Sequence, residues 1–460
     1  MKIAVISGSP KGRDSATLRY VRFLQLNYPQ ADFRIEHVGQ QIGKLEKNNA
    51  FFDSLIDRIK EADAVLWATP VYYFVVPSQL KRFIELVFER DRREAFSGKT
   101  AASLITSIHF FDHTAVYYLH AVSEDLGMHY GGSYTAEMND LRRRREKRRL
   151  LSFGKIMLAF FETDPAVPYC RTYPVSPAGN FVYQPGKPEE KIDPAGKRIV
   201  IVADLENTST SLAGMVKYLM ALFIEQPELI NLADKDISLG CRGCLACGAE
   251  NRCFYEKRDS FRDFFEDKVK KADILIIAGE IRDRFLSARI KRFMDRSFYM
   301  NHVPYFGNKQ VGLLIAGPLG HNANIRDILE SYIRMHDGNP AGIVTDEPAS
   351  SKEIDALLEK LAADTVFLAG EGYLAPPSFP LVGGRKIFRD FIAGPAQLVF
   401  PADYRYYREN RFFDYPHRKR GLQAATVILR NLLKIPRFRR EFSKRIVKGL
   451  VQPLDRSLSS

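Results

Sequence analysis

Short apolar runs alternate with amphipathic stretches through the first third of the chain, which predicts strands alternating with helices. Strands are expected at residues 2–9, 32–38, 62–73, 100–107 and 128–134. Helices are expected around residues 20–24, over 51–61, from 78, from about 114 and over 141–161. Such alternation is typical of a doubly wound parallel sheet, whose ligand lies at the carboxyl ends of the strands.

The same pattern restarts at residue 197. Strands are expected at residues 198–203, 311–315 and 341–344, and helices at 209–224, from 260, at 325–335 and at 351–367. Sliding the chain by 210 positions places Ala62-Asp63 on Ala272-Asp273 and residues 80–85 on residues 290–295 without a gap. The two halves are therefore predicted to be copies of one α/β fold.

A stretch with little periodicity separates the two halves. Residues 163–196 contain seven prolines, at positions 165, 168, 174, 177, 185, 188 and 194, which is typical of a linker. Cys170 lies in it, and we expect this thiol to have no role. The predicted organisation is a first domain at 1–162, a linker at 163–196, a second domain at 197–372 and a basic aromatic extension at 373–460.

Four of the five cysteines lie within thirteen residues, at Cys241, Cys244, Cys247 and Cys253. This C-x2-C-x2-C-x5-C spacing favours a [4Fe-4S] cluster, since a tight loop can point all four thiolates inward. Structural zinc is an alternative, although zinc sites more often use two separated C-x2-C pairs; unligated thiols are another. Disulfides are not favoured, because the sequence starts Met1-Lys2-Ile3 without a signal peptide, and a cytoplasmic location is expected.

The first expected strand runs into a polar turn and then a helix. The turn offers hydroxyls, cations and the N–H groups of a helix N-terminus, which together suit a phosphate monoester. A turn capped by its own hydroxyls is the alternative. The candidate phosphate-binding residues are Ser7, Ser9, Pro10, Lys11, Ser15 and Thr17.

Three motifs resemble the flavodoxin-like NADPH-dependent FMN reductases: Ser7-Gly-Ser-Pro-Lys11, Thr69-Pro-Val-Tyr72 and Leu80-Lys-Arg-Phe83. The resemblance implies that the first loop holds the FMN phosphate and that Pro70, Val71, Tyr72 and Tyr73 border the isoalloxazine ring. The cysteine run, followed by Ala272-Asp273 and residues 290–296, resembles the iron–sulfur flavoprotein branch, which implies a [4Fe-4S] cluster. Together the resemblances cover about residues 1–135 and 197–370. They imply two tandem flavodoxin-like sheets followed by a basic, mostly helical extension.

Each half departs from this pattern where the other keeps it. The second half has Ala203-Asp204-Leu205-Glu206-Asn207 in place of the phosphate loop, and two carboxylates work against binding a dianion. It also has Gly279-Glu280-Ile281-Arg282 in place of the Pro-Tyr loop, while the first half has no cysteine between residues 39 and 62. We therefore expect FMN on the first half and the cluster on the second, joined as an intrachain pseudo-dimer.

The expected function is electron transfer between FMN and the cluster, with NAD(P)H or an electron-transfer protein such as ferredoxin as the partner. His109, Phe110, Phe111 and His113 are candidates for the open face of the flavin, or for loop residues packed on the sheet edge. No general base or nucleophile motif is evident. One alternative function is an NAD(P)H-dependent FMN or quinone reductase with an incidental cluster. Another is a redox-sensing nucleic-acid-binding protein, although nucleic acid is not favoured.

The net charge of +13 is concentrated locally. The Arg-rich start of the helix at 141–161 is interpreted as a solvated face. Residues 417–450 hold eleven Lys or Arg residues against Glu441 as the one acid, with apolar residues at helical spacing on both sides of Pro436. This pattern predicts two short amphipathic helices broken at the proline. Such a segment suits an anionic membrane surface at the cytoplasmic leaflet, an acidic protein, or docking on the protein's own domains.

Overall fold

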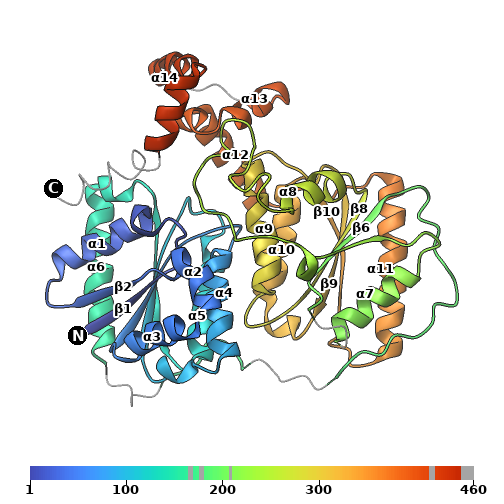
Figure 1. The fold of residues 1–460 in the computed structure, drawn as a ribbon, viewed down its shortest axis with the longest axis horizontal. Coiled ribbons are helices and arrows are strands. Elements are labelled where there is room, and N and C mark those ends of the chain that lie inside the picture. Colours follow the sequence, from blue (N-terminus) through green and yellow to red (C-terminus); the bar gives the residue numbers. More distant parts are fainter. Residues whose placement is uncertain (164–168, 176–180, 207–209, 414–419, 447–460) are drawn as a thin grey trace. The chain divides into compact units, whose positions relative to one another are not determined.

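The computed structural model describes residues 1–163, 169–175, 181–206, 210–413 and 420–446. The chain divides into two compact units (Figure 1). Unit 1 comprises Met1–Val175, Leu239–Leu245 and the residues from Arg439 onward. Unit 2 comprises Ser176–Ser238 and Ala246–Phe438. The segment 239–245 thus belongs to unit 1, although it lies within the second half of the sequence.

Unit 1 contains a five-stranded sheet in which all strand pairs are parallel, with the order β2-β1-β3-β4-β5. Its strands are β1 (Lys2–Ser7), β2 (Asp32–Glu36), β3 (Ala64–Pro70), β4 (Thr100–Ser107) and β5 (His129–Glu137). Its helices are α1 (Ala16–Asn27), α2 (Val38–Lys47), α3 (Asn49–Lys60), α4 (Ser78–Glu89), α5 (Asp112–Asp125) and α6 (Arg144–Phe161). The predicted doubly wound sheet is confirmed, whereas α2 was not predicted.

Unit 2 contains a second parallel sheet, with the order β10-β9-β8-β6-β7. Its strands are β6 (Ile199–Ala203), β7 (Glu228–Asn231), β8 (Ile274–Glu280), β9 (Gln310–Ala316) and β10 (Asn339–Thr345). Its helices are α7 (Ser211–Ala221), α8 (Phe261–Phe264), α9 (Ala288–Arg296), α10 (Ala323–Met335) and α11 (Ser351–Glu371). Read from β7, this is the same topology as in unit 1, so the tandem flavodoxin-like fold is confirmed.

The repeat extends to the positions of individual strands. Ala64 and Ile274 begin β3 and β8, Thr100 and Gln310 begin β4 and β9, and His129 and Asn339 begin β5 and β10. Each of these pairs is 210 positions apart. In unit 1, α1 and α6 pack their apolar residues on one face of the sheet, and in unit 2 α7 and α11 do the same.

Both ends of the Pro-rich segment are fastened to their own units. The buried Glu124 accepts hydrogen bonds from the backbone N–H groups of Thr172 (2.8 Å) and Tyr173 (2.9 Å). Burial raises the pKa of the Glu124 carboxyl, but these hydrogen bonds outweigh it and the pKa is lowered overall. In unit 2, the Tyr183 hydroxyl donates to Asp355. Cys170 is exposed. Pro165, Pro168 and Pro177 lie outside the described residues.

The C-terminal extension is helical, as predicted. In unit 2 it contains α12 (Phe379–Ala393), α13 (Pro401–Glu409) and α14 (Arg420–Leu432). The backbone N–H of His302 donates to Asp403, a buried residue of α13, which fastens the extension to unit 2. Residues 433–435 break the helix and residues 436–446 are helical again, so Pro436 opens the second helix rather than interrupting it.

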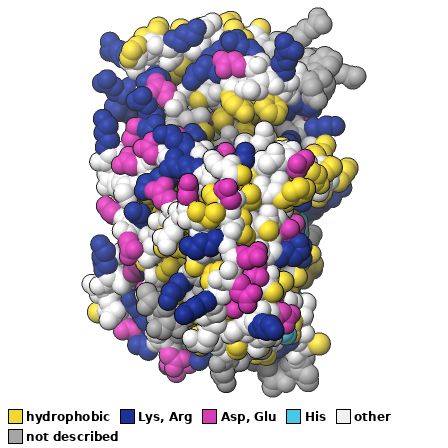
Figure 2. Space-filling view, turned by 90° about the vertical axis from the view of Figure 1, so that its right-hand side faces the viewer, with side chains coloured by type: hydrophobic (Ala, Val, Ile, Leu, Met, Phe, Trp, Pro, Cys, Tyr) yellow, Lys and Arg dark blue, Asp and Glu magenta, His cyan; other side chains and the backbone are white. Residues whose placement is uncertain are grey.

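The structure describes only some of the basic residues of the extension. Lys and Arg side chains gather at the top of the face in Figure 2, at the level of the C-terminal helices of unit 2. The predicted tail cations at 418, 419 and 448 lie outside the described residues. Within the described ranges, no helix is long and apolar enough to cross a membrane.

Each repeat buries a Lys with a carboxylate one helical turn later. Lys81 and Glu85 on α4 pair at 2.7 Å, and Lys291 and Asp295 on α9 pair at the matching positions. Both side chains of the second pair are 0% exposed. Removing one partner of a buried ion pair leaves an uncompensated charge, which costs more than losing the attraction itself.

We therefore expect Lys291→Met to lower the free energy of unfolding by about 3–5 kcal/mol. The double variant Lys291→Met/Asp295→Leu should recover most of this loss, because no buried charge remains. Urea unfolding of the full chain, followed by circular dichroism, measures the effect. Lys360→Met is the control, since Lys360 and Asp364 form a similarly spaced pair whose side chains are 70% and 42% exposed, and little change is expected. Equal losses at Lys291 and Lys360 would contradict the argument.

Candidate functional site

The predicted phosphate loop connects β1 to α1 at the carboxyl edge of the unit 1 sheet. Ser9 and Ser15 are buried, and Lys11 is partly buried. Ser15 precedes α1, but its side chain makes no capping hydrogen bond. The buried Ser7 Oγ has no hydrogen-bond partner among the described residues. Since buried hydroxyls are normally satisfied, these groups fit a phosphate that would accept from them.

Two further contacts shape this loop. Thr17 Oγ1 lies 2.6 Å from Thr106 Oγ1 at the end of β4, so its hydroxyl is tied to the sheet. Gly39 of α2 packs against the loop so closely that a Cβ atom there would collide with the carbonyl oxygen of Gly8. Neither contact can be predicted from the sequence, because a threonine pair between distant elements and a glycine inside a short helix carry no local signal.

The predicted Pro-Tyr loop follows β3 at the same edge. Val71 N–H donates to the Thr106 carbonyl at 3.1 Å, and Tyr72 and Val75 exchange backbone hydrogen bonds of 2.8 and 3.2 Å. Tyr73 and Phe74 have φ values of +37° and +68°, which non-glycine residues rarely adopt. Such backbone strain often occurs at ligand-binding loops.

The four aromatic candidates after β4 play different roles. Phe110 and Phe111 pack on Phe74, with ring centroids 5.6 and 4.9 Å away, so they form the support of the Pro-Tyr loop. His109 is half-exposed, and its Nδ1 lies 2.9 Å from Asp112 Oδ2, which orients the ring. His113 is exposed on α5. Its ring lies 5.5 Å from Phe111 and 5.7 Å from Tyr117, so both exposed histidines have partners in unit 1.

The first half of the cysteine run lies against this edge of unit 1. Gln79 Nε2 donates to the carbonyl oxygen of Cys241 at 3.0 Å. Gly243 has a φ of +63°, and a Cβ atom there would collide with the Tyr72 hydroxyl and the Lys11 side chain. A larger residue at position 243 would therefore displace two of the side chains that are predicted to hold FMN.

Lys11 lies close enough to the thiols to interact with them electrostatically. Burial lowers the pKa of Lys11, while negative charge on Cys241, Cys244 and Asp14 acts in the opposite direction. The sequence predicts that the phosphate loop and the cysteine run belong to separate domains. The structure instead assigns one pair of the cysteines to unit 1.

The second half of the cysteine run belongs to unit 2. Cys247 Sγ lies 3.2 Å from Asn301 Oδ1, and Cys253 Sγ lies 4.0 Å from an Arg296 nitrogen. Arg296 is buried and pairs with Asp259 at 2.6 Å. In the described part of the chain, no group of three or more His, Cys, Asp or Glu side chains is arranged to hold a metal ion. The four thiols are a donor set that suits a cluster, and the [4Fe-4S] site stays a prediction.

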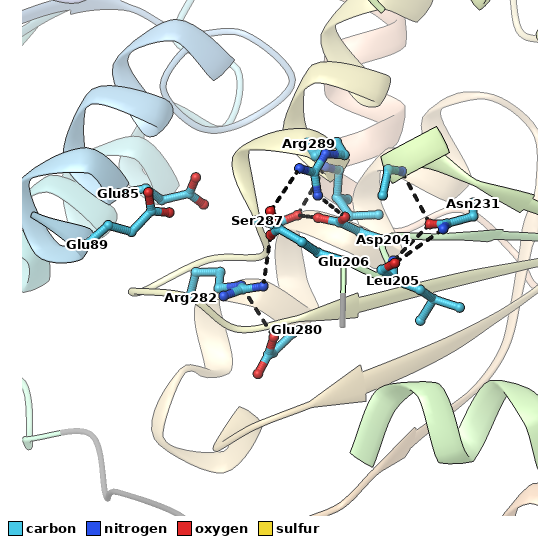
Figure 3. Close-up of polar contacts among 12 residues, drawn as sticks. Glu85, Glu89, Asp204, Leu205, Glu206, Asn231, Glu280, Arg282, Ser287 and Arg289 are labelled. Atoms are coloured by element: carbon cyan, nitrogen blue, oxygen red, sulfur yellow. Dashed lines mark hydrogen bonds and ion pairs between the residues drawn. The ribbon is translucent and has the colours of Figure 1, made fainter. Parts of the chain in front are cut away.

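The corresponding loop of unit 2 is filled by its own charges (Figure 3). Gly8 N–H donates to the Ala68 carbonyl in unit 1, and Asp204 N–H donates to the Ala278 carbonyl in unit 2, so Asp204 stands where Gly8 does. The Asp204 carboxylate is bonded by Ser287 and Arg289. A phosphate bound in this loop of unit 2 would face the Asp204 carboxylate instead of backbone N–H groups that could donate to it.

The neighbouring side chains complete the network. Glu206 lies 3.7 Å from Arg282 and 3.6 Å from Arg289, and Glu280 lies 3.3 Å from Arg282 (Figure 3). Arg282 occupies the position of Tyr72 in the equivalent turn. Its N–H donates to the Phe285 carbonyl at 3.1 Å, as the Tyr72 N–H donates to the Val75 carbonyl in unit 1. Asn207 lies outside the described residues. The two arginines are thus paired with carboxylates of unit 2.

Comparisons with known proteins agree with the geometry of unit 1. Residues 1–140 match the family model of the NADPH-dependent FMN reductases. A stretch of 63 residues is 36% identical to an FMN-dependent NADH:quinone oxidoreductase of Vibrio vulnificus (strain YJ016), covering 13% of this chain. The matched stretch spans 32% of that relative's length.

Part of the chain is also similar to solved structures. The apo form of an NADH:FMN oxidoreductase (EMOB) is 22% identical with a TM-score of 0.30, covering 37% of this chain and 95% of the other. The NAD(P)H:acceptor oxidoreductase FerB of Paracoccus denitrificans is 21% identical with a TM-score of 0.29, covering 35% of this chain and 98% of the other. On the evidence of the matching family model, residues 1–140 form a domain of the NADPH-dependent FMN reductase family.

Proposed function

We propose that the chain is an FMN-dependent oxidoreductase that takes electrons from NAD(P)H and passes them to free flavin or a quinone. The observation that carries this proposal is the loop after β1. There, at the carboxyl edge of a parallel sheet, the buried Ser7 hydroxyl has no hydrogen-bond partner among the described residues, and the Ser9 hydroxyl accepts only from the N–H of Lys11 among the hydrogen bonds described. The family match of residues 1–140 and the named activity of the Vibrio vulnificus relative support it.

The residues of unit 1 would divide the work of holding the cofactor. Ser7, Ser9 and Ser15 would donate to the phosphate, and Lys11 would neutralise part of its charge. Pro70, Val71, Tyr72 and Tyr73 would border the ring, and the Phe74, Phe110 and Phe111 cluster would fix that loop. Bound FMN would supply the exchange of a hydride for single electrons. The filled loop around Asp204 supports one flavin per chain.

A second candidate function adds electron transfer to a [4Fe-4S] cluster on Cys241, Cys244, Cys247 and Cys253, with an electron carrier such as ferredoxin as partner. Its support is the compact cysteine spacing and the position of Cys241 beside the proposed flavin site. The family match of residues 1–140 and the named activity of the Vibrio vulnificus relative support the flavin reductase function, which is therefore favoured over this one.

The first test removes the phosphate site. Ser9→Asp/Lys11→Asp should weaken FMN binding by about a hundredfold or more, because a charge-assisted contact is lost and two carboxylates face the phosphate. Quenching of FMN fluorescence during titration measures the affinity. Ser54→Asp/Lys60→Asp carries the same charge change on the exposed side of α3 and should bind FMN normally. Equal affinities for the two double variants would refute the assignment of the loop.

The cluster is tested by metal content. Protein purified without oxygen should hold about four iron atoms and matching acid-labile sulfide per chain if the cysteine run binds a [4Fe-4S] cluster. Cys244→Ala should then lose the iron and keep FMN, because the phosphate loop is unchanged, while Cys170→Ala should keep both. Zinc without sulfide, or a chain without metal, would remove the second candidate and leave the flavin reductase standing.

The tail supports peripheral attachment to an anionic surface. Ile428, Ile435 and Phe438 are exposed among the tail cations, with exposed fractions of 65%, 54% and 46%. We expect the full chain to float with anionic liposomes at low salt and not with neutral ones, since each cation near such a surface contributes roughly 1 kcal/mol. Replacing these three residues with Ser keeps every charge and should reduce flotation through the lost apolar area. A wild-type chain that stays unbound would leave the tail as a docking element.

A further inference from the structure

A groove of about 750 Å³ lies between α6 and the strand β5 of unit 1. Tyr134 of β5 and Phe153 and Ile156 of α6 line it together with four cations, Arg144, Arg145, Arg148 and Arg149. Because β5 is the outermost strand of its sheet, the groove follows a sheet edge. The matched family resemblance does not account for it, since residues 144–156 lie beyond the matched range.

Most of these cations are not neutralised. Arg144, Arg145 and Arg148 are exposed and form no ion pair with any residue that the structure describes, whereas Arg149 pairs with Glu146 at 3.0 Å. Glu146 is the single acid of α6. The groove therefore presents a local excess of positive charge to an approaching molecule.

The position of the arginines on the helix is unfavourable. They occupy the first two turns of α6, where the helix dipole places partial positive charge and where acidic residues are stabilising. Mutual repulsion between neighbouring cations adds to this cost. A local arrangement that opposes stability without a compensating internal contact indicates a role outside folding.

The chemistry of the groove favours a protein partner. Its apolar lining consists of the Tyr134 and Phe153 rings, 5.5 Å apart, and of Ile156, which is 64% exposed. Ser133 and Ser152 also line the groove, and the four arginines lie beside these residues in the first two turns of α6. Exposed apolar and aromatic side chains next to arginines are typical of protein interfaces. A small anion would require buried polar groups, but these arginines are all exposed.

The groove also lies close to the proposed flavin site along the chain. The start of α6 follows the carboxyl end of β5, the edge from which the Ser7–Thr17 loop also leaves. Asp140, just before α6, lies 4.0 Å from Nε2 of His109 in the aromatic loop. A partner bound over the first turns of α6 would therefore sit near the loops that border the ring.

We propose that this groove docks a small acidic electron-carrier protein that delivers electrons to the flavin, an inference that rests on the proposed function. Two reduced one-electron carriers each lose one electron, FMN gains both with two protons from solvent, and two oxidised carriers leave. The arginines attract the acidic face of the carrier, and Phe153 and Ile156 contact an apolar side chain of it.

The test uses the full-length chain loaded with FMN and a chemically reduced, acidic plant-type ferredoxin. In anaerobic stopped-flow mixing at low salt, Arg144→Gln/Arg145→Gln/Arg148→Gln should slow flavin reduction by about tenfold or more, because steering by charge raises association rates. The wild-type rate should fall steeply with added salt and the variant's rate should not. Lys187→Gln/Lys191→Gln/Lys352→Gln makes the same charge change elsewhere on the surface and should behave as wild type.

Two further measurements separate this inference from the proposed function. Flavin reduction by NAD(P)H should be equal in all variants, and its absence in every variant would overturn the proposed function alone. Calorimetric titration with oxidised ferredoxin requires no flavin chemistry, and the arginine variant should lose binding. Equal binding by the arginine and lysine variants would overturn the docking site. The docking site would also be overturned if the arginine variant kept ferredoxin binding but lost binding to single-stranded RNA or to anionic liposomes. That outcome would assign the groove to those partners.

Discussion

A parallel sheet directs the carboxyl ends of all its strands to one edge, and the candidate chemistry of unit 1 depends on this constraint. The phosphate loop, the Pro-Tyr loop and the aromatic loop follow β1, β3 and β4, which are neighbours in the sheet. The backbone hydrogen bonds that end these strands, such as Val71 N–H to the Thr106 carbonyl, hold the loops together before any ligand binds. Binding then requires little rearrangement of the backbone.

Comparison of the two repeats separates the features of this edge that the fold requires from the side chains that would contact a ligand. The turn after β3 and the turn after β8 keep the same backbone hydrogen bonds, and both following helices bury a lysine with a carboxylate. The side chains facing the loop differ, since Asp204 stands for Gly8 and Arg289 for Gln79. Because these backbone hydrogen bonds are the same in both units, the difference between the predicted phosphate loop and its counterpart in unit 2 is one of side-chain charge.

The sequence predicted what repeats along the chain and missed what depends on distant contacts. Apolar runs and the shift of 210 positions predicted the five strands of unit 1, three of the five strands of unit 2 and the second copy of the fold, because burial on both faces leaves a strong local pattern. The contact of Gly39 with Gly8, the pairing of Thr17 with Thr106 and the assignment of Leu239–Leu245 to unit 1 could not be predicted. These depend on tertiary packing. The break before Pro436 was placed only approximately, as is usual for helix boundaries.

Each half of the cysteine run has its own source of positive charge. Lys11 interacts with Cys241 and Cys244 in unit 1, and the buried Arg296 lies beside Cys253 in unit 2. A nearby cation stabilises negative charge on sulfur, whether that charge belongs to a thiolate or to a thiolate-bound cluster. In unit 1 the same lysine is also the proposed phosphate ligand, so one ammonium group serves two anionic partners. If phosphate binds at the proposed site, its charge would change the field at Cys241 and Cys244 through Lys11.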